Sequence, residues 1–265
     1  MTVWCNGVFS ASGEVTLPAF DPAFSGLGAF ETLLAKNGKC WALEAHQERL
    51  RQSLALLTIP EPDTEPLQEV ISELLKRNSL EDGEARIRVV VSGTPEGAAS
   101  MIVTVCEYQK PSEMVTLGIS KRSIFESNPL RKAKTLSYAE NWLFHFEAAA
   151  LGVDDVLVGN SSGHLVEASM ANVIVRHRGI LKTPPLSAGC LSGITRDILL
   201  KKCKTIQEEE ILIEDLAEVD EIWLCSSLRR MQYATSLNGR EFDRPSCHYF
   251  ELSEALEILI ENEGL

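Results

Sequence analysis

The sequence lacks the cysteine spacings of a metal site or of a disulfide framework. Its seven cysteines, an odd number, stand at positions 5, 40, 106, 190, 203, 225 and 247, and no two of them form a CxxC pair. Neither a zinc site nor structural disulfides are therefore indicated, and no metal is expected. We interpret the cysteines as reduced thiols that serve as small core residues in a cytoplasmic protein.

Long apolar runs and an excess of basic residues are absent as well. No stretch of about 18 consecutive apolar residues occurs, so no membrane-spanning helix is predicted. The first residues, MTVWCNGVFSASGEV, do not combine a basic region with an apolar run, so no signal peptide is expected. The formal net charge of −13 would repel phosphate backbones and disfavours nucleic-acid binding. We expect a globular protein with a small-molecule substrate.

Strand and helix patterns are both present in the 265 residues, of which 45% are hydrophobic. Asn6-Gly7 and Asn37-Gly38 each separate two apolar runs and predict β-hairpins with type I′ turns. Apolar periodicity predicts helices at 44–58, 65–78 and 138–151, and further helices that begin near Ile194 and Tyr249. Strand-like segments interleaved with few helices predict an α+β fold.

The polar segment EYQKPSEM at 107–114 contains a proline and is the best candidate for a link between domains. The sequence therefore predicts a smaller N-terminal α+β domain at 1–110 and a larger C-terminal α+β domain at 111–265. No internal repeat or low-complexity run occurs.

Arg49 lies on the predicted inward face of the helix at 44–58. Helical spacing groups it with Ala42, Ala45, Leu50, Ser53 and Leu57. An inward arginine needs an anion, and a carboxylate or a phosphate suits its planar fork. A structural salt bridge is the alternative that spacing alone leaves open.

The segment AGCLSGITRDILLKKC predicts an anion site at the start of a helix. Gly193 precedes the helix and Thr195 lies in its first turn, where backbone N–H groups and a hydroxyl are available as donors. Ordinary punctuation of a helix by Ser192-Gly193 is the alternative.

Glu167 and Lys134 are two further candidates. Glu167 stands in a strand pattern, in HLVEASMANVIV, and is either an exposed strand residue or a buried acid with a cationic partner. Lys134, in RKAKTLSY, precedes a helix whose predicted packing face carries Trp142, Phe146 and Ala150. A lysine held there, partly desolvated and near another positive centre, could form a Schiff base. An amine, a carboxylate, an inward arginine and a helix start are together what a phosphorylated aldehyde cofactor requires.

In several blocks the chain resembles the fold-type IV pyridoxal-phosphate enzymes, the family of class IV aminotransferases and 4-amino-4-deoxychorismate lyases. The blocks are FSGLGAFETLLAKNGKCWALEAHQERLRQS, KTLSYAENWLFHFEAAALGVDDVLV, GHLVEASMANVIV, GILKTPPLSAGCLSGITR and DEIWLCSSLRR. They follow one another in the family's order, with Lys134 and Glu167 separated by 33 residues. The resemblance implies a two-domain α+β fold like that of D-amino-acid aminotransferase, with pyridoxal 5′-phosphate between the domains of a homodimer.

The resemblance also implies a role for each candidate. Lys134 would form the Schiff base and move the substrate proton, which places the reactive lysine in the C-terminal domain. Glu167 would hydrogen-bond the pyridine nitrogen and keep it protonated. Arg49, Ile194 and Thr195 would contact the phosphate, and Ser227 would contact either the phosphate or the pocket.

The substrate side is less defined by the sequence. Phe30, Thr32 and Arg88 are candidate substrate residues. Thr32 is equally explained as a strand former, and Arg88, which shares a strand face with Arg86, as a salt-bridged residue. Gly93 stands where the resembling D-amino-acid enzymes have an arginine, which counts against the D-amino-acid type. Arg230 stands where a glycine is common in the family.

The segment CSSLRR resembles that of the deoxychorismate lyases, so the leading hypothesis is 4-amino-4-deoxychorismate lyase, which releases pyruvate and 4-aminobenzoate for folate biosynthesis. The alternative is an aminotransferase that transfers an amino group from a branched-chain amino acid to 2-oxoglutarate. A catalytically silent relative is the third hypothesis.

Overall fold

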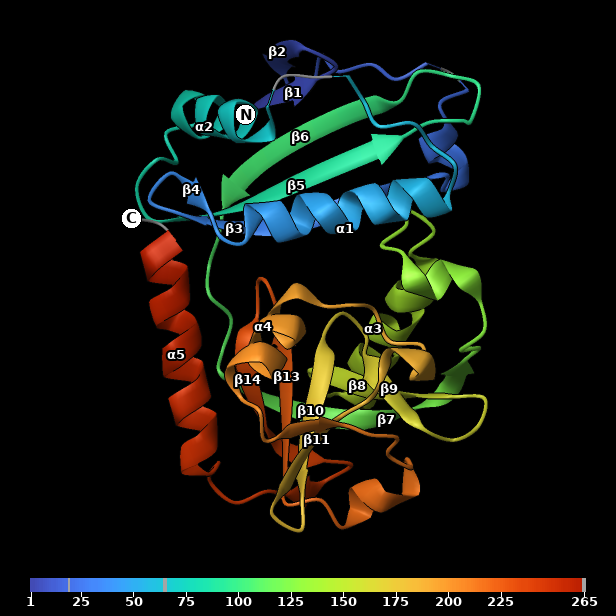
Figure 1. Cartoon of the computed structure of the whole chain (residues 1–265), viewed down its shortest axis with the longest axis vertical. Helices are drawn as coiled ribbons and strands as arrows, with labels where there is room; N and C mark the ends of the chain where they lie inside the picture. The colour runs from blue at the N-terminus through green and yellow to red at the C-terminus, as the bar shows by residue number, and fades with distance from the viewer. Residues whose placement is uncertain (19, 64–65, 264–265) are drawn as a thin grey trace. The chain divides into compact units, whose positions relative to one another are not determined.

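The computed structural model describes residues 1–18, 20–63 and 66–263 (Figure 1). Contacts divide the chain into two units. Unit 1 comprises residues 1–109, 133–138 and 258–265, and unit 2 comprises residues 110–132 and 139–257. None of the helices in the described ranges has both the length and the apolar composition that crossing a bilayer needs.

Unit 1 is a six-stranded sheet with two helices. Its elements are β1 (Thr2–Cys5), β2 (Val8–Ala11), the 3-10 helix η1 (Pro22–Ser25), β3 (Gly28–Lys36), β4 (Lys39–Cys40), α1 (Leu43–Leu56), α2 (Leu67–Arg77), β5 (Glu84–Ser92) and β6 (Ser100–Glu107). The strand order is β2-β1-β6-β5-β3-β4, and every neighbouring pair is antiparallel. Alternation along the strands sends Leu33, Ile87 and Val103 into a core that α1 and α2 cover.

Both predicted hairpins of unit 1 are confirmed. Asn6 and Gly7 have φ of 47° and 88°, and Asn37 and Gly38 have φ of 50° and 81°, as a type I′ turn requires. The helix predicted at 44–58 is α1. The helix predicted at 65–78 is α2, which begins at Leu67; Glu65 lies outside the described residues.

Unit 2 is a nine-stranded mixed sheet with helices. Its elements are β7 (Met114–Ile124), η2 (Pro129–Lys132), α3 (Ala139–Leu151), β8 (Asp155–Asn160), β9 (Leu165–Ala168), β10 (Asn172–His177), β11 (Ile180–Thr183), η3 (Leu186–Ala188), α4 (Ile194–Lys202), β12 (Ile206–Glu208), η4 (Glu214–Ala217), β13 (Glu221–Ser226), β14 (Arg230–Leu237) and β15 (Arg240–Glu241). The main strand order is β12-β11-β10-β13-β14-β7-β8-β9, with β15 beside β14. The final helix, α5 (Cys247–Glu263), belongs to unit 2 as far as Glu257.

The α+β architecture is thus confirmed. The sequence placed residue 134 in the C-terminal domain, whereas contacts group the segment 133–138 with unit 1. The reason is that this segment pairs with β3, through the bridge between Ala29 and Thr135. The division between residues 109 and 110 falls within the expected link at 107–114; the two folding domains themselves stay a prediction.

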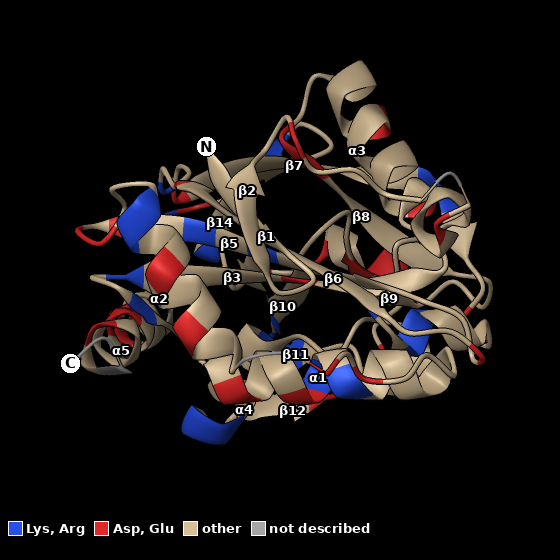
Figure 2. Ribbon diagram, turned by 90° about the horizontal axis from the view of Figure 1, so that it is seen from above, with Lys and Arg blue, Asp and Glu red and all other residues tan. Residues whose placement is uncertain are grey.

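The predicted packing face of α3 is wrong. Phe144 and Ala148 are the residues that α3 buries in the core of unit 2, with Val156 and Val158 of β8. Trp142 and Phe146 are instead 48% and 59% exposed. Both faces of this helix are apolar, so periodicity could not tell which one packs against the sheet. Figure 2 shows α3 almost free of charged positions, unlike α1 and α2.

Candidate active site

Lys134 is held in unit 1 as part of a short edge segment beside β3. The backbone N–H of Phe30 donates to the Lys134 carbonyl at 2.9 Å, and the N–H of Leu136 donates to the Gly28 carbonyl at 2.8 Å. Gly28 permits this approach, because a Cβ there would lie 2.4 Å from the Val91 carbonyl oxygen and 2.6 Å from Leu136 Cδ1. The lysine backbone is therefore fixed to a rigid sheet instead of a loose loop.

The Lys134 amine lies among aromatic rings. Its Nζ is 4.5 Å from the centroid of the Phe30 ring and 5.2 Å from that of Tyr138, and the two rings meet edge to face at 5.1 Å. The Arg88 guanidinium carbon lies 4.3 Å from the same Phe30 centroid. The side chains of Lys134 and Arg88 thus share one aromatic ring.

The three predicted substrate residues lie together in unit 1. Thr32 pairs with Arg88 across β3 and β5, and Phe30 lies two residues away on the same strand face. The predicted alternative for Arg88, a salt bridge, is not present among the described residues. Partial desolvation lowers the pKa of the Arg88 guanidinium, and the neighbouring Arg86 lowers it further.

Arg49 forms the ion pair that the sequence left open as an alternative. Its Nε and Nη2 each donate at 2.7 Å to the two oxygens of Glu31 on β3. The inward face of α1 is formed by His46, Leu50, Ser53 and Leu54, whereas Ala45, expected on that face, is exposed. A buried acid opposite Arg49 was not foreseen.

Glu167 in unit 2 is a buried acid with a cationic partner, which resolves the alternative left open for it. Its Oε1 accepts from Arg131 Nη2, and its Oε2 accepts from the backbone N–H of Leu191 at 3.1 Å. The side chain of this arginine is only 11% exposed. It also donates to the Gly189 carbonyl at 3.0 Å and to Glu140 at 3.1 Å.

The start of α4 carries a buried donor group. Thr195 is 1% exposed, and its Oγ1 has no hydrogen-bond partner among the described residues. The preceding loop is fixed by Asn172, whose Nδ2 donates to the Leu191 carbonyl at 2.9 Å. A Cβ on Gly193 would lie 1.7 Å from Asn172 Oδ1, so only glycine permits this close approach. A buried hydroxyl without a partner is costly, and an anion at the helix start would satisfy it.

Glu167, Ile194 and Thr195 are thus brought together by the loop at 189–193, since Leu191 binds Glu167 and α4 begins three residues later. Ser227 follows β13, whose Cys225 pairs with Asn172 of β10. Across the described residues, no cluster of His, Cys, Asp and Glu side chains forms a metal site.

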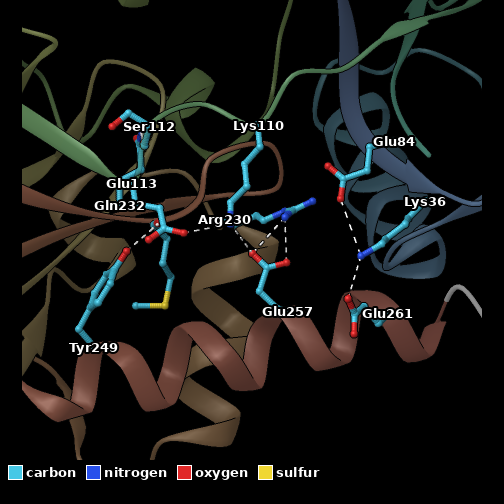
Figure 3. A network of polar contacts seen from close by, with 11 residues as sticks. Lys36, Glu84, Lys110, Ser112, Glu113, Arg230, Gln232, Tyr249, Glu257 and Glu261 are labelled. Carbon is cyan, nitrogen blue, oxygen red and sulfur yellow. Dashed lines mark hydrogen bonds and ion pairs between the residues drawn. The ribbon is translucent and has the colours of Figure 1, made fainter.

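Arg230 has a structural role in unit 2. Its φ is 58°, a conformation that glycine adopts without cost, which accounts for the glycine common there in the resembling family. Figure 3 shows its guanidinium against Glu257 of α5, where Nη1 donates to the carboxylate at 3.0 and 2.8 Å. Lys110 Nζ donates to the same Glu257 at 3.0 Å. These contacts fasten α5 to the segment that follows β6.

Sequence reasoning missed Glu31, His46, Ser53 and Arg131 as partners of the candidate residues. A signal for Glu31 was present, since strand alternation places it with Ala29 and Leu33 on the face that turns inward. An inward acid and an inward arginine could have been paired. No comparable signal existed for Arg131, which lies in a short 3-10 helix.

The sequence is similar to two curated bacterial proteins over nearly its whole length. The bifunctional aminodeoxychorismate lyase / D-amino acid transaminase of Mycobacterium tuberculosis is 28% identical, over 92% of this chain and 93% of its own. The aminodeoxychorismate lyase of Bacillus subtilis is also 28% identical, over 98% of this chain and 94% of its own.

Solved structures agree with the fold. The branched-chain aminotransferase of Thermoproteus uzoniensis with norvaline superposes with a TM-score of 0.91 at 26% identity, covering 99% of this chain and 96% of its own. A hypothetical aminotransferase from M. tuberculosis, in its PLP-bound form, gives 0.86 at 26% identity, covering 99% and 100%. The fold is therefore that of the fold-type IV enzymes, as the sequence resemblance implied.

The family described as amino-transferase class IV matches residues 28–237, a span that contains every candidate residue of both units. The matched proteins of this family are aminotransferases and aminodeoxychorismate lyases. The chain therefore belongs to the class IV aminotransferase family, as an enzyme of the lyase or aminotransferase kind.

Proposed function

We propose that the protein is a pyridoxal-phosphate enzyme that acts as 4-amino-4-deoxychorismate lyase. When bound, pyridoxal phosphate supplies an aldehyde that bonds to amines and a ring that accepts an electron pair from the substrate. The observation that carries the cofactor proposal is the buried Thr195 hydroxyl, without a partner at the start of α4, on the loop that binds Glu167. An anionic phosphate fits this donor set.

The proposed roles follow from the contacts within each unit. In unit 1, Lys134 Nζ attaches the cofactor and takes and returns the substrate proton, while Arg49 binds the phosphate. In unit 2, Glu167 would hold a proton on the ring nitrogen, with its carboxylate oriented by the ion pair to Arg131. Ile194 and Thr195 donate to the phosphate through backbone N–H and hydroxyl groups, and Ser227 adds a further contact.

Substrate carboxylates are proposed to bind at Arg88, beside Thr32 and Phe30. Its guanidinium lies over Phe30 with no acidic partner among the described residues, as a site for an incoming anion requires. The D-amino-acid specificity is disfavoured at Gly93, where a Cβ would lie 2.9 Å from Ile59 Cγ2, so an arginine there would displace its neighbours.

The lyase proposal is supported by the B. subtilis relative, which is an aminodeoxychorismate lyase and matches 98% of this chain. The alternative, an aminotransferase for branched-chain amino acids and 2-oxoglutarate, is favoured by the overlap with the T. uzoniensis enzyme.

The experiment is to incubate purified protein with 4-amino-4-deoxychorismate and to follow pyruvate. We expect pyruvate and 4-aminobenzoate in equal amounts. No pyruvate, together with glutamate formed from leucine and 2-oxoglutarate, would replace the lyase with the aminotransferase. Neither product, from protein that shows the absorbance of bound cofactor, would leave the catalytically silent relative.

We also infer that two copies associate through the exposed face of α3. Trp142, Leu143 and Phe146 are 48%, 49% and 59% exposed there. Both acids of α3 have a cationic partner, Arg131 for Glu140 and Arg122 for Glu147. These pairs reduce the repulsion that a chain of net charge −13 would bring to contact with its own copy.

Sedimentation analysis tests this homodimer. The wild type is expected to be dimeric and the Phe146→Glu variant monomeric, whereas Phe250→Glu, which changes an exposed phenylalanine of α5, should leave the dimer intact. A monomeric wild type, or a dimeric Phe146→Glu variant, would exclude this face as the interface. The cytoplasm is the proposed location, in keeping with the buried thiols Cys40, Cys190 and Cys225.

A further inference from the structure

Arg49 belongs to a buried cluster of charged and polar side chains in unit 1. It consists of Glu31 on β3 with His46 and Arg49 on α1. The side chains of Glu31 and His46 are 2% and 1% exposed, and that of Arg49 is 11% exposed. Glu31 accepts from three donors: Arg49 Nε at 2.7 Å, Arg49 Nη2 at 2.7 Å, and His46 Nδ1 at 2.7 Å.

The charges of the cluster are set by these contacts. Burial raises the pKa of Glu31, but the charge and hydrogen bonds of Arg49, and then those of His46, outweigh it and bring the pKa to about 2. Burial lowers the pKa of His46; Glu31 opposes this, while Arg49 and Lys134 lower it further. The stable arrangement is therefore ionised Glu31, cationic Arg49 and neutral His46, whose Nδ1–H donates to the carboxylate.

The geometry restrains the guanidinium in two ways. Contact through both Nε and Nη2 fixes the plane of the guanidinium, because a single hydrogen bond would let it rotate. His46 binds the same oxygen, Oε2, that accepts from Nη2, so the carboxylate is itself prevented from turning.

The cluster is connected to Lys134 through one buried hydroxyl. Ser53 Oγ accepts the backbone N–H of Lys134 at 3.1 Å and donates to the Arg49 carbonyl at 2.9 Å. Lys134 and Arg49 are thereby fixed to the same helix. Glu31 is next to Phe30 in β3, and Phe30 binds the Lys134 carbonyl.

We propose that Glu31, held by His46, is a positioning residue that orients Arg49 for the phosphate group of the cofactor. This inference rests on the proposed function, in which Arg49 is a phosphate contact. It assigns to Glu31 and His46 an effect on phosphate recognition, beyond neutralising a buried cation.

The two explanations predict effects of opposite sign. If Glu31 only neutralises Arg49, its removal uncovers a positive charge, and a phosphate should bind as well or better. If Glu31 orients Arg49, its removal releases the guanidinium, and the phosphate should bind more weakly. Loss of a residue that supports a metal ligand changes metal affinity by about 10- to 100-fold, and we expect an effect of the same order here.

The experiment compares pyridoxal phosphate with pyridoxal, which lacks the phosphate, as ligands of the full chain freed of cofactor. Absorbance titration gives both dissociation constants. The Kd of pyridoxal divided by the Kd of pyridoxal phosphate is the affinity ratio, which reports the contribution of the phosphate alone. We expect Glu31→Gln and Glu31→Asp to lower this ratio by about 10- to 100-fold. Glu31→Asp keeps the charge but shortens the side chain, so it serves where Glu31→Gln does not fold. Glu73→Gln, which breaks an exposed pair with Arg77 in the same unit, is the matched control and should change nothing.

Two variants of His46 test whether its hydrogen bond to Glu31 is needed. His46→Asn can place an amide N–H near the position of Nδ1 and should keep the wild-type ratio, whereas His46→Leu should lower it. An unchanged or increased ratio in both Glu31 variants would overturn the positioning role while leaving the cofactor proposal intact. Equal affinity of the wild type for the two ligands would instead remove the phosphate role of Arg49, and this inference with it.

Discussion

In each unit a candidate cofactor residue forms a buried arginine–glutamate pair, and the two pairs are built in opposite ways. In unit 1, Glu31 accepts from three donors and fixes Arg49. In unit 2, Arg131 donates to three acceptors, the side chains of Glu140 and Glu167 and the Gly189 carbonyl, and so fixes Glu167. We infer that Glu31 and Arg131 are the supports, whereas Arg49 and Glu167 are the members proposed to bind the cofactor. Burial of a charge alone would not have separated these roles.

The largest expected effect concerns the amine that both pairs are proposed to serve. Lys134→Ala should reduce pyruvate release by about 10²- to 10⁴-fold, because the proton on the substrate loses its carrier. Lys132→Ala, two residues away and exposed, is the control and should retain activity. An active Lys134→Ala enzyme would mean that Lys134 is not the reactive amine, and that the two arginine–glutamate pairs have structural roles only. Rates of pyruvate formation at saturating substrate decide the matter.

The support in unit 2 can be removed directly. Arg131→Met leaves Glu167 buried without its cation and should lower the free energy of unfolding by about 3–5 kcal/mol. Arg122→Met breaks the pair with Glu147 at 2.8 Å, whose arginine is 55% exposed, and should cost less than about 1 kcal/mol. Urea unfolding of both variants gives the comparison. Similar losses in the two would mean that Arg131 is not the anchor of its pair.

Low pH should weaken the pair in unit 1 through its support, because Glu31 is a carboxylate that acid can protonate. The support in unit 2, Arg131, is a guanidinium that stays charged. The pKa of Glu31 falls from 4.5 to about 2 on folding, a shift that corresponds to about 3 kcal/mol. Since the folded pKa is the lower one, this stabilisation is present above the unfolded value and is lost as the pH falls toward the folded value. The difference in stability between wild type and Glu31→Gln should therefore shrink from about pH 5 to about pH 2. A difference independent of pH, measured by urea unfolding across this range, would contradict the pairing.

The smallest effect is expected at the start of α4. Thr195→Val removes a buried hydroxyl that has no partner, so the cofactor-free protein should be as stable as the wild type or more stable. Affinity for pyridoxal phosphate should nevertheless fall by about 0.5–1.5 kcal/mol. Thr183→Val is the matched contrast, because Thr183 Oγ1 donates to the Val173 carbonyl at 2.7 Å. That variant should lose stability and keep its affinity, so equal behaviour of the two variants would count against a ligand at Thr195.

Local chemistry made the elements of the fold predictable from the sequence. The Asn-Gly turns and the apolar stripe of α2 depend on neighbouring residues, and these predictions were confirmed. Long-range pairing was harder. Glu31 and Arg49 are separated by 18 positions, and Arg131 and Glu167 by 36, so neither pair follows from a local pattern.

The packing of α3 shows the same limit from another side. Trp142 and Phe146 have the spacing of a core stripe, yet Phe144 and Ala148 are the residues that reach the sheet. A helix with apolar residues on more than one face does not show by its spacing which face its own chain covers. The order of the blocks around Lys134 and Glu167 identified the family, whereas the supports of those residues required the three-dimensional structure.

The most direct test of the account is to locate the bond between protein and cofactor. Reduction of the pyridoxal-phosphate-loaded protein with borohydride, followed by digestion and mass spectrometry, reports which lysine carries the pyridoxyl group. The account predicts a single modified peptide with the label on Lys134, and no label in the Lys134→Ala variant. A label on Lys132, or no label on wild-type protein loaded with cofactor, would contradict it.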